Sequence, residues 1–241
     1  MNHEMLTVFL HIPKTGGTTL SEIFRREYKD GELFDHNTLY GKGKKVDLLN
    51  EMEKNKIKAV AGHYFYGIHQ HFSKPYNYFT LLRDPVDRVI SSYYFLQDFA
   101  GHERLKNMTL EEFVVNEHRA HNLQSALISG IRRKPDINKA KKNLQSFSVV
   151  GVTEMFDDTL FLLKKEFNWK DIRYTKQNIT KKRLSKEEIP ASVIDLIKEH
   201  NSLDIELYDF AKQLLHEKLA NLTEDERKQL QKFKQRQRLL S

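Results

Sequence analysis

The stretch PKTGGTT, residues 13–19, combines residue types that bind a phosphate group. An apolar run precedes it and apolar residues at helical spacing follow it, so the stretch joins a strand to a helix. In that position successive backbone N–H groups and the dipole of the helix form a cradle for an anion. Lys14 adds a positive charge, and Thr18 and Thr19 add hydroxyl groups. The stretch therefore predicts a site for a phosphate or phosphosulfate group, with a plain turn before a helix as the alternative.

The order of residues in this loop distinguishes it from the Walker A loop of ATPases and kinases. A Walker A loop has its lysine after the glycines and Ser or Thr next to that lysine, whereas Lys14 precedes Gly16 and Gly17. The sequence also offers no clear carboxylate at the end of a neighbouring strand to hold Mg²⁺. We therefore expect phosphate binding without a metal ion, which points away from ATP hydrolysis and kinase chemistry.

A histidine directly follows the second apolar run of the chain. Residues 57–61 form this run, which ends at Gly62, and His63 comes next. Histidine titrates near neutral pH, so His63 can take a proton from a hydroxyl group, and a histidine bonded within the turn is the alternative. His69 and His71 follow closely as rival bases, substrate contacts or, least favoured, a metal-binding pair.

The elements that must position these residues are short apolar strands alternating with amphipathic helices. The predicted strands are residues 7–12, 57–61, 78–82 and 147–152. Such alternation predicts an α/β fold of the P-loop-like, three-layer kind, with a central, mainly parallel sheet flanked by helices and a helical C-terminal part. Ligands of such sheets bind at the carboxyl ends of the strands, where the phosphate loop, His63 and Arg83 all fall. His11, inside the first strand, is expected to be packed rather than reactive.

A second strand end followed by a helix is found in LLRDPVDRVISSYYF, residues 81–95. Asp84 suits the N-cap of a helix and Pro85 its first position, so a strand ends near Arg83 and a helix bearing Ser91 follows. Taken alone, Arg83 would be interpreted as half of a surface ion pair and Ser91 as an exposed helix residue. Arg83 falls, however, at the same strand ends as the phosphate loop and His63, which favours a shared site instead.

These stretches together resemble the sulfotransferases that use PAPS (3'-phosphoadenosine 5'-phosphosulfate) as donor. HIPKTGGTTL is similar to their 5'-phosphosulfate loop, in the form typical of the Golgi-type carbohydrate group that includes heparan sulfate 2-O-sulfotransferases and bacterial-type soluble relatives. Residues 81–95 are similar to the 3'-phosphate element of the family. AGHYFYG, HNLQSALISG and VGVTEMFDDTLFLL are also family-like, so the likeness runs from about Val8 to about Leu163.

The resemblance implies roles for individual residues in sulfuryl transfer to a hydroxyl group. It makes His63 the catalytic base and Lys14 the cation that stabilises the leaving phosphate, with PAP (3'-phosphoadenosine 5'-phosphate) as product. Arg83 and Ser91 would bind the 3'-phosphate. The donor-binding residues implied in this way are Lys14, Thr15, Gly16, Gly17, Thr18, Thr19, Arg83 and Ser91. No metal is expected.

Contacts to the acceptor are predicted at a few further positions. Arg88 lies one helical turn before the serine of the 3'-phosphate element and could bind an acidic acceptor or brace that phosphate. Asn122 and Gln124 match polar positions near the family's cleft, and His69 is a further acceptor-binding candidate. The basic residues 176–183 resemble the family's late nucleotide-contacting loop, and a solvated surface loop explains them equally well. The resemblance suggests a saccharide acceptor, with a lipid or small alcohol left open.

The composition bounds the architecture and the partners. A chain of 241 residues suits one domain, residues 1–241, in which 221–241 form a basic terminal helix that opens with a capping box from Thr223 to Glu226. This helix is most simply solvated, or it contacts an anionic polymer. Forty Lys and Arg against 33 Asp and Glu give a net charge of +7, which favours anionic partners.

The absence of cysteine excludes disulfides, thiolate metal sites and cysteine nucleophiles. The N-terminal apolar stretch is too short for a signal peptide, and no later segment has the length of a membrane span, so we expect a cytoplasmic protein.

Two other functions compete with a sulfotransferase. A phosphotransferase of the P-loop kinase type shares the strand, loop and helix at the start of the chain, and it would need Mg²⁺ and ATP. A non-catalytic module could bind polyanions through the basic surface. We expect no nucleic-acid partner, because basic and aromatic residues are not interleaved along the chain.

Overall fold

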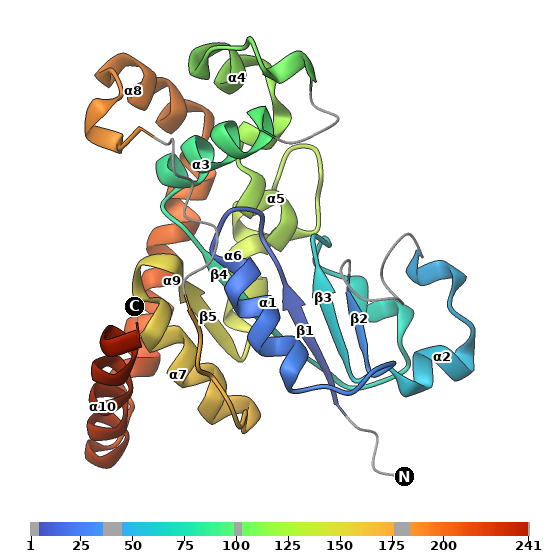
Figure 1. Ribbon diagram of the computed structural model, residues 1–241. Helices are drawn as coiled ribbons and strands as arrows, with labels where there is room; N and C mark the ends of the chain where they lie inside the picture. The colour runs from blue at the N-terminus through green and yellow to red at the C-terminus, as the bar shows by residue number, and fades with distance from the viewer. Residues whose placement is uncertain (1–4, 36–44, 99–102, 176–183, 241) are drawn as a thin grey trace.

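A five-stranded parallel sheet in the order β2-β3-β1-β4-β5 forms the centre of the fold (Figure 1). The computed structural model describes residues 5–35, 45–98, 103–175 and 184–240. The strands are β1 (Leu6–Leu10), β2 (Leu33–Asp35), β3 (Ala59–Gly62), β4 (Tyr76–Leu82) and β5 (Val149–Val152). The sequence predicted all of them except β2, which has only three residues and so no periodicity to identify it.

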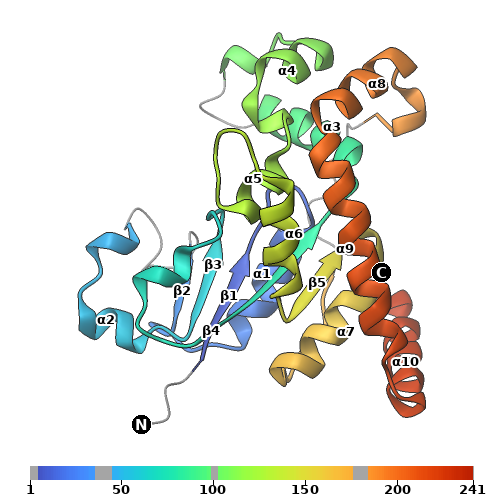
Figure 2. The same ribbon diagram turned by 180° about the vertical axis from the view of Figure 1, so that it is seen from behind.

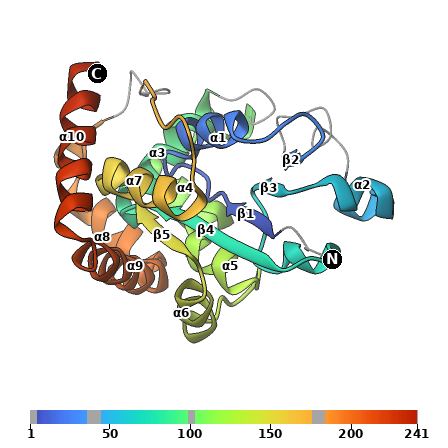
Figure 3. The same ribbon diagram turned by 90° about the horizontal axis from the view of Figure 1, so that it is seen from below.

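Helices cover both faces of this sheet, as Figures 1, 2 and 3 show from three sides. One face carries α1 (Gly17–Arg26) and α7 (Phe156–Phe167), and the other carries α5 (Leu123–Ser129), α6 (Ile137–Gln145) and α9 (Ser202–Ala220). Every residue of β1, β3 and β5 is buried, as expected for parallel strands covered on both sides. The predicted three-layer α/β fold is therefore confirmed.

A group of helices lies above the carboxyl ends of the strands (Figure 1). It consists of α3 (Pro85–Gln97), α4 (Leu110–Asn116) and α8 (Ala191–His200), which share a separate hydrophobic cluster with Val89, Phe113 and Ile197 at its centre. The predicted N-cap of α3 is present, because the Asp84 carboxylate accepts a hydrogen bond from the backbone N–H of Asp87 at 3.0 Å. This cap fixes where β4 ends and α3 begins.

The remaining helices lie at the periphery. They are α2 (Glu51–Lys56), next to the β2 side of the sheet, and α10 (Glu224–Leu240), next to α7. Single-turn 3-10 helices occupy Val46–Leu48, Ile68–His71, Glu103–Leu105, His118–Ala120, Thr153–Met155 and Lys186–Glu188. Among the residues that the structure describes, no helix has the length and apolar character needed to cross a membrane.

The basic terminal helix α10 begins with the predicted capping box. The backbone N–H of Thr223 donates to Glu226 at 2.8 Å, and the N–H of Glu226 donates to the Thr223 hydroxyl at 3.3 Å. The helix is not simply solvated, however, because it packs against α7. Leu230 is buried in this contact, and Lys234 forms an ion pair with Asp158 on α7 at 2.7 Å.

Candidate active site

The residues predicted to do chemistry follow the carboxyl ends of neighbouring strands. Leu10, the last residue of β1, is paired with Gly62 of β3 and with Thr80 of β4. His63 and Arg83 come directly after β3 and β4, and the loop at residues 13–16 follows β1 after two intervening residues. The register therefore brings the phosphate loop and the two side chains to one edge of the sheet.

The loop after β1 is held in one conformation by hydrogen bonds to its backbone. Its backbone has positive φ angles at Lys14 (69°) and at Gly16 (81°). The hydroxyl of Thr15 donates to the carbonyl of Ile12 at 2.9 Å, and the hydroxyl of Thr153 donates to the carbonyl of Thr15 at 2.8 Å. A loop fixed in this way can present its backbone N–H groups to an anion without reordering.

The predicted donor-binding residues in this loop differ in how they face solvent. Thr15 is completely buried and its hydroxyl is used within the loop, so only its backbone can contribute to a ligand site. Gly16 and Thr18 are exposed, Lys14 is half-buried, and Gly17 and Thr19 are buried. The exposed part of the loop is therefore small.

Gly17, the first residue of α1, allows His11 to pack against the start of this helix. A Cβ atom at Gly17 would lie 1.9 Å from Nε2 of His11, far inside contact distance. The His11 ring stacks on Phe9 with ring centroids 5.1 Å apart and lies 4.5 Å from the His63 ring. His11 is thus packed, as predicted, and it contacts the proposed base.

His63 is exposed and oriented by the backbone of His11. Its Nδ1 lies 2.8 Å from the carbonyl oxygen of His11. A carbonyl oxygen only accepts hydrogen bonds, so Nδ1 carries the hydrogen and the lone pair of the neutral ring is on Nε2. The arrangement leaves His63 able to accept a proton at Nε2, which is what a general base requires.

Arg83 lies against the phosphate loop. Its Nη1 donates to the carbonyl oxygen of Lys14 at 3.1 Å, and its backbone N–H and C=O both pair with the side-chain amide of Gln124 at 3.0 Å. The ammonium group of Lys14 lies 3.9 Å from the centre of the exposed Phe95 ring on α3. Lys14 and Arg83 are thus brought together, while Ser91 lies two turns into α3 and is only 4% exposed.

Arg88 and Asn122 were both expected to contact the acceptor. Instead, Arg88 on α3 and Asn122, just before α5, both contact residues at the start of α9. Arg88 is completely buried, its Nη atoms donate to the carbonyl of Arg119 at 3.2 Å, and its Nε is 4.0 Å from Asp204. Asn122 accepts from the backbone N–H groups of Leu203 and Asp204 at 3.0 Å, near the start of α9. These contacts give both side chains structural roles, and no atom of Arg88 is exposed to an acceptor.

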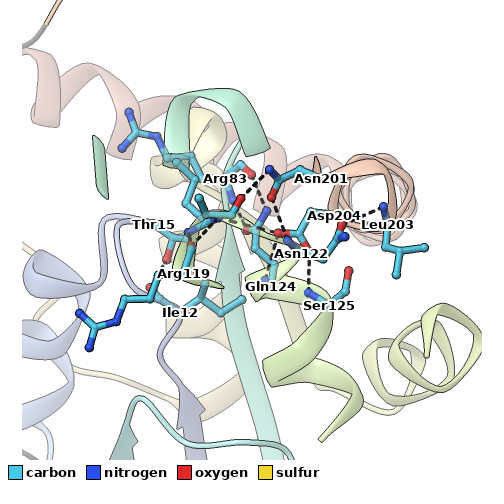
Figure 4. A network of polar contacts seen from close by, with 12 residues as sticks. Ile12, Thr15, Arg83, Arg119, Asn122, Gln124, Ser125, Asn201, Leu203 and Asp204 are labelled. Atoms are coloured by element: carbon cyan, nitrogen blue, oxygen red, sulfur yellow. Dashed lines mark hydrogen bonds and ion pairs between the residues drawn. The ribbon is translucent and has the colours of Figure 1, made fainter. Parts of the chain in front are cut away.

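The polar network around Asp204, part of which Figure 4 shows, explains this arrangement. The Asp204 carboxylate accepts from the backbone N–H groups of Gln124 at 3.1 Å and Ser125 at 2.7 Å. Burial raises the pKa of Asp204, and the positive charge of Arg88 and these hydrogen bonds oppose that effect. Because Gln124 in turn holds the backbone of Arg83, the network positions the end of β4.

His69, the other acceptor-binding candidate, lies at the opposite edge of the sheet. Its ring stacks on Tyr76 with centroids 3.7 Å apart, and its Nδ1 is 2.8 Å from the hydroxyl of Tyr78. Tyr76 is the first residue of β4, and it is paired with Leu6, the first residue of β1. His69 therefore lies at the amino ends of the strands. His69 is therefore not brought together with His63, and burial lowers its pKa.

A cavity of about 220 Å³ next to His63 contains residues that the sequence analysis missed. Arg25 on α1 and Asp35 at the end of β2 line it together with His11, Ser21 and His63. Arg25 Nε donates to Asp35 at 2.9 Å. Burial and the negative charge of Asp35 raise the pKa of Tyr64 to about 12. The only sequence signal for Asp35 was its place after two apolar residues, Leu33 and Phe34.

Two further expectations concern the late loop and metal binding. The basic residues 176–183 lie outside the described residues, but the nearby Lys186 forms an ion pair with Asp84, at the start of α3, at 3.3 Å. In the part of the chain that the structure describes, no three His, Cys, Asp or Glu side chains are grouped so that they could hold a metal ion.

Comparison with known proteins gives one family and a set of relatives. A model of the sulfotransferase family matches residues 1–211. Heparan-sulfate 6-O-sulfotransferase 2 of Gallus gallus is 26% identical over 300 residues, covering 97% of this chain and 72% of the relative. Heparan-sulfate 6-O-sulfotransferase 1 of Homo sapiens is 26% identical over 293 residues, covering 95% and 70%. These relatives are 6-O enzymes, whereas the sequence motifs suggested the 2-O type.

Proposed function

The chain belongs to the sulfotransferase family, and from this we propose that it transfers the sulfuryl group of PAPS to a hydroxyl group of a carbohydrate. The observation that best supports the proposal is the convergence of the phosphate loop, Arg83 and the Nε2 atom of His63 at one edge of the sheet. The names of the relatives favour a heparan-sulfate-like polysaccharide as acceptor and its 6-hydroxyl as the reacting group.

His63 is proposed to start the reaction by accepting the proton of the acceptor hydroxyl at Nε2. The hydroxyl oxygen then forms a bond to sulfur, and the bond between sulfur and the bridging oxygen of the donor breaks. PAP leaves with that electron pair, and the proton remains on His63. The His11 carbonyl keeps Nδ1 protonated throughout, so the ring is held in the tautomer that the step requires.

Lys14 is proposed to stabilise the charge that develops on the leaving 5'-phosphate. Its ammonium group lies against the Phe95 ring, at the same edge as Arg83. The loop around it offers backbone N–H groups at the start of α1, which suits an anionic donor. Arg83 and Ser91 are proposed to bind the 3'-phosphate, Arg83 through its charge and Ser91 through its hydroxyl group.

The experiment that tests this function is transfer of labelled sulfuryl from PAPS to a panel of glycans, together with thermal unfolding. PAP should raise the unfolding temperature, because a ligand that binds only the folded state stabilises it. ATP with Mg²⁺ should not. A shift with ATP and Mg²⁺ but none with PAP would favour the phosphotransferase alternative, and label transfer to no glycan would remove the carbohydrate acceptor from the proposal.

A further inference from the structure

The cavity next to His63 extends from the proposed base toward the amino ends of the strands. Asp35 is paired with Ala61, two residues before His63 on the same chain segment. The ion pair between Arg25 and Asp35 therefore lies deeper along the strands than the imidazole of His63. A group bound in this cavity would be in reach of the residues next to the base and of the ion pair at once.

Arg25 is the more exposed partner of this ion pair. The Arg25 side chain is 30% exposed, whereas that of Asp35 is 3% exposed. A guanidinium group has five N–H donors, and the bond to Asp35 uses the one on Nε. Among the described residues, Asp35 is the hydrogen-bond and ion-pair partner of this guanidinium. Asp35 thus fixes the guanidinium through Nε, and Arg25 has further N–H donors with which it can bind an anion in the cavity.

We propose that this cavity is an acceptor subsite in which Arg25 binds an anionic substituent, a carboxylate or a sulfate group, of the sugar whose hydroxyl reaches His63. The inference rests on the proposed function, because the role of His63 as base makes the neighbouring cavity a place for the acceptor. A volume of about 220 Å³ is below the roughly 300–1,000 Å³ of pockets for drug-sized ligands. The subsite therefore selects on a single sugar rather than on a longer stretch of polymer.

The test compares Arg25→Gln with a matched control, Arg26→Gln. Arg26 is the next residue of α1 and loses the same charge, but it bonds the carbonyl of Arg173 and does not line the cavity. The acceptor is a hexuronate–glucosamine oligosaccharide in three forms. The first carries both a carboxylate and an N-sulfate group. The second has its carboxylate reduced and keeps the N-sulfate group, and the third keeps the carboxylate and has an N-acetyl group in place of the N-sulfate group. The two altered forms distinguish a carboxylate from a sulfate as the recognised group.

For Arg25→Gln we expect KM for the doubly anionic acceptor to rise about 10- to 100-fold, the effect of losing a hydrogen bond to a charged group. With the acceptor form that lacks the recognised anion, Arg25→Gln and the wild type should have the same KM. The affinity for PAP should stay the same, and Arg26→Gln should behave as the wild type. An equal rise in KM for all three acceptors, or no rise for any, would overturn the subsite.

Arg25→Gln also leaves Asp35 without its ion-pair partner, which can destabilise the fold. The double variant Arg25→Gln/Asp35→Asn removes both charges and should show the same acceptor preference as the single variant. Calorimetric binding of the three oligosaccharides to the PAP-bound protein separates this inference from the proposed function. Loss of the anion preference in Arg25→Gln supports the subsite even if the wild type transfers no sulfuryl group, and an unchanged preference overturns it even if transfer is observed.

Discussion

Nδ1 of His63 lies 2.8 Å from the carbonyl oxygen of His11, the residue that follows the neighbouring strand β1. This contact sets the tautomer of the ring and turns Nε2 away from the backbone. The ring of His11 also packs against that of His63. The proposed base is therefore positioned by one residue in two ways, through its main chain and through its side chain.

Replacing His63 with Ala should reduce the rate of sulfuryl transfer by about 100- to 10,000-fold, the usual contribution of a general base. The affinity for PAP should stay close to that of the wild type, because the contact that orients His63 is made to the backbone of His11, ahead of the phosphate loop. Turnover with labelled PAPS and calorimetry with PAP measure the two effects. Loss of PAP affinity in this variant would assign His63 a structural role instead.

A methyl group at Gly17 should displace His63 indirectly, through the ring of His11. In Gly17→Ala the new Cβ would lie 1.9 Å from Nε2 of His11, so the His11 ring must move, and His63 packs on that ring. A displacement of about 1 Å in a catalytic group can lower the rate by about 100-fold. We expect a loss of kcat of that order, measured at saturating PAPS.

The double variant Gly17→Ala/His11→Ser is the control for this effect. Serine removes the imidazole that the methyl group meets, but it keeps the backbone carbonyl that bonds His63. If that carbonyl is what positions the base, the double variant recovers part of the lost kcat. Turnover as low as in the single variant would mean that the methyl group acts on the phosphate loop and not through His11.

Local signals account for the parts of this site that the sequence predicts. The loop at residues 13–19, the Asp84 cap and the strand ends at His63 and Arg83 are each encoded by neighbours within a few residues. A cytoplasmic location and a single domain stay predictions from the sequence.

Contacts between distant segments account for what the sequence could not predict. Asn122 caps a helix that starts about 80 residues later, and Arg88 pairs with Asp204 on that same helix. Polar residues in such buried networks look the same in sequence as polar residues that line a cleft. The cavity at Arg25 was missed for a related reason, because Asp35 ends a strand of only three residues.

Replacing Arg83 with Ala should weaken the binding of PAP far more than that of adenosine 5'-phosphosulfate, which lacks the 3'-phosphate. A hydrogen bond to a charged group accounts for about a 10- to 100-fold difference in affinity. Calorimetry with the two nucleotides measures the ratio. Arg83 also bonds the carbonyl of Lys14, so equal weakening of both nucleotides would mean that it braces the loop and does not bind the 3'-phosphate.

The stability of the fold should depend on pH through His69. Burial lowers the pKa of this histidine, so the folded chain favours the neutral ring. Its contribution is fully present above the unfolded pKa of about 6.5 and is lost as the pH falls through the lower pKa of the folded chain. In urea unfolding at a series of pH values, the wild type should lose more stability on acidification than His69→Gln. Sulfuryl transfer by His69→Gln should be unchanged, because this residue lies at the other edge of the sheet.

Arg88 should prove essential for stability but not for acceptor binding. Arg88→Met leaves the buried carboxylate of Asp204 without its cation, a change that costs about 3–5 kcal/mol in other buried pairs. Gln124 and Ser125 donate to different oxygens of Asp204, so in Arg88→Met/Asp204→Asn the single amide oxygen can keep only one of these two hydrogen bonds. The variant removes the unpaired buried charge, however, so urea unfolding should show that part of the loss is recovered. KM for the acceptor should match that of the wild type in both variants, measured where both are folded. A KM that rises for the acceptor alone would instead mean that Arg88 reaches the substrate.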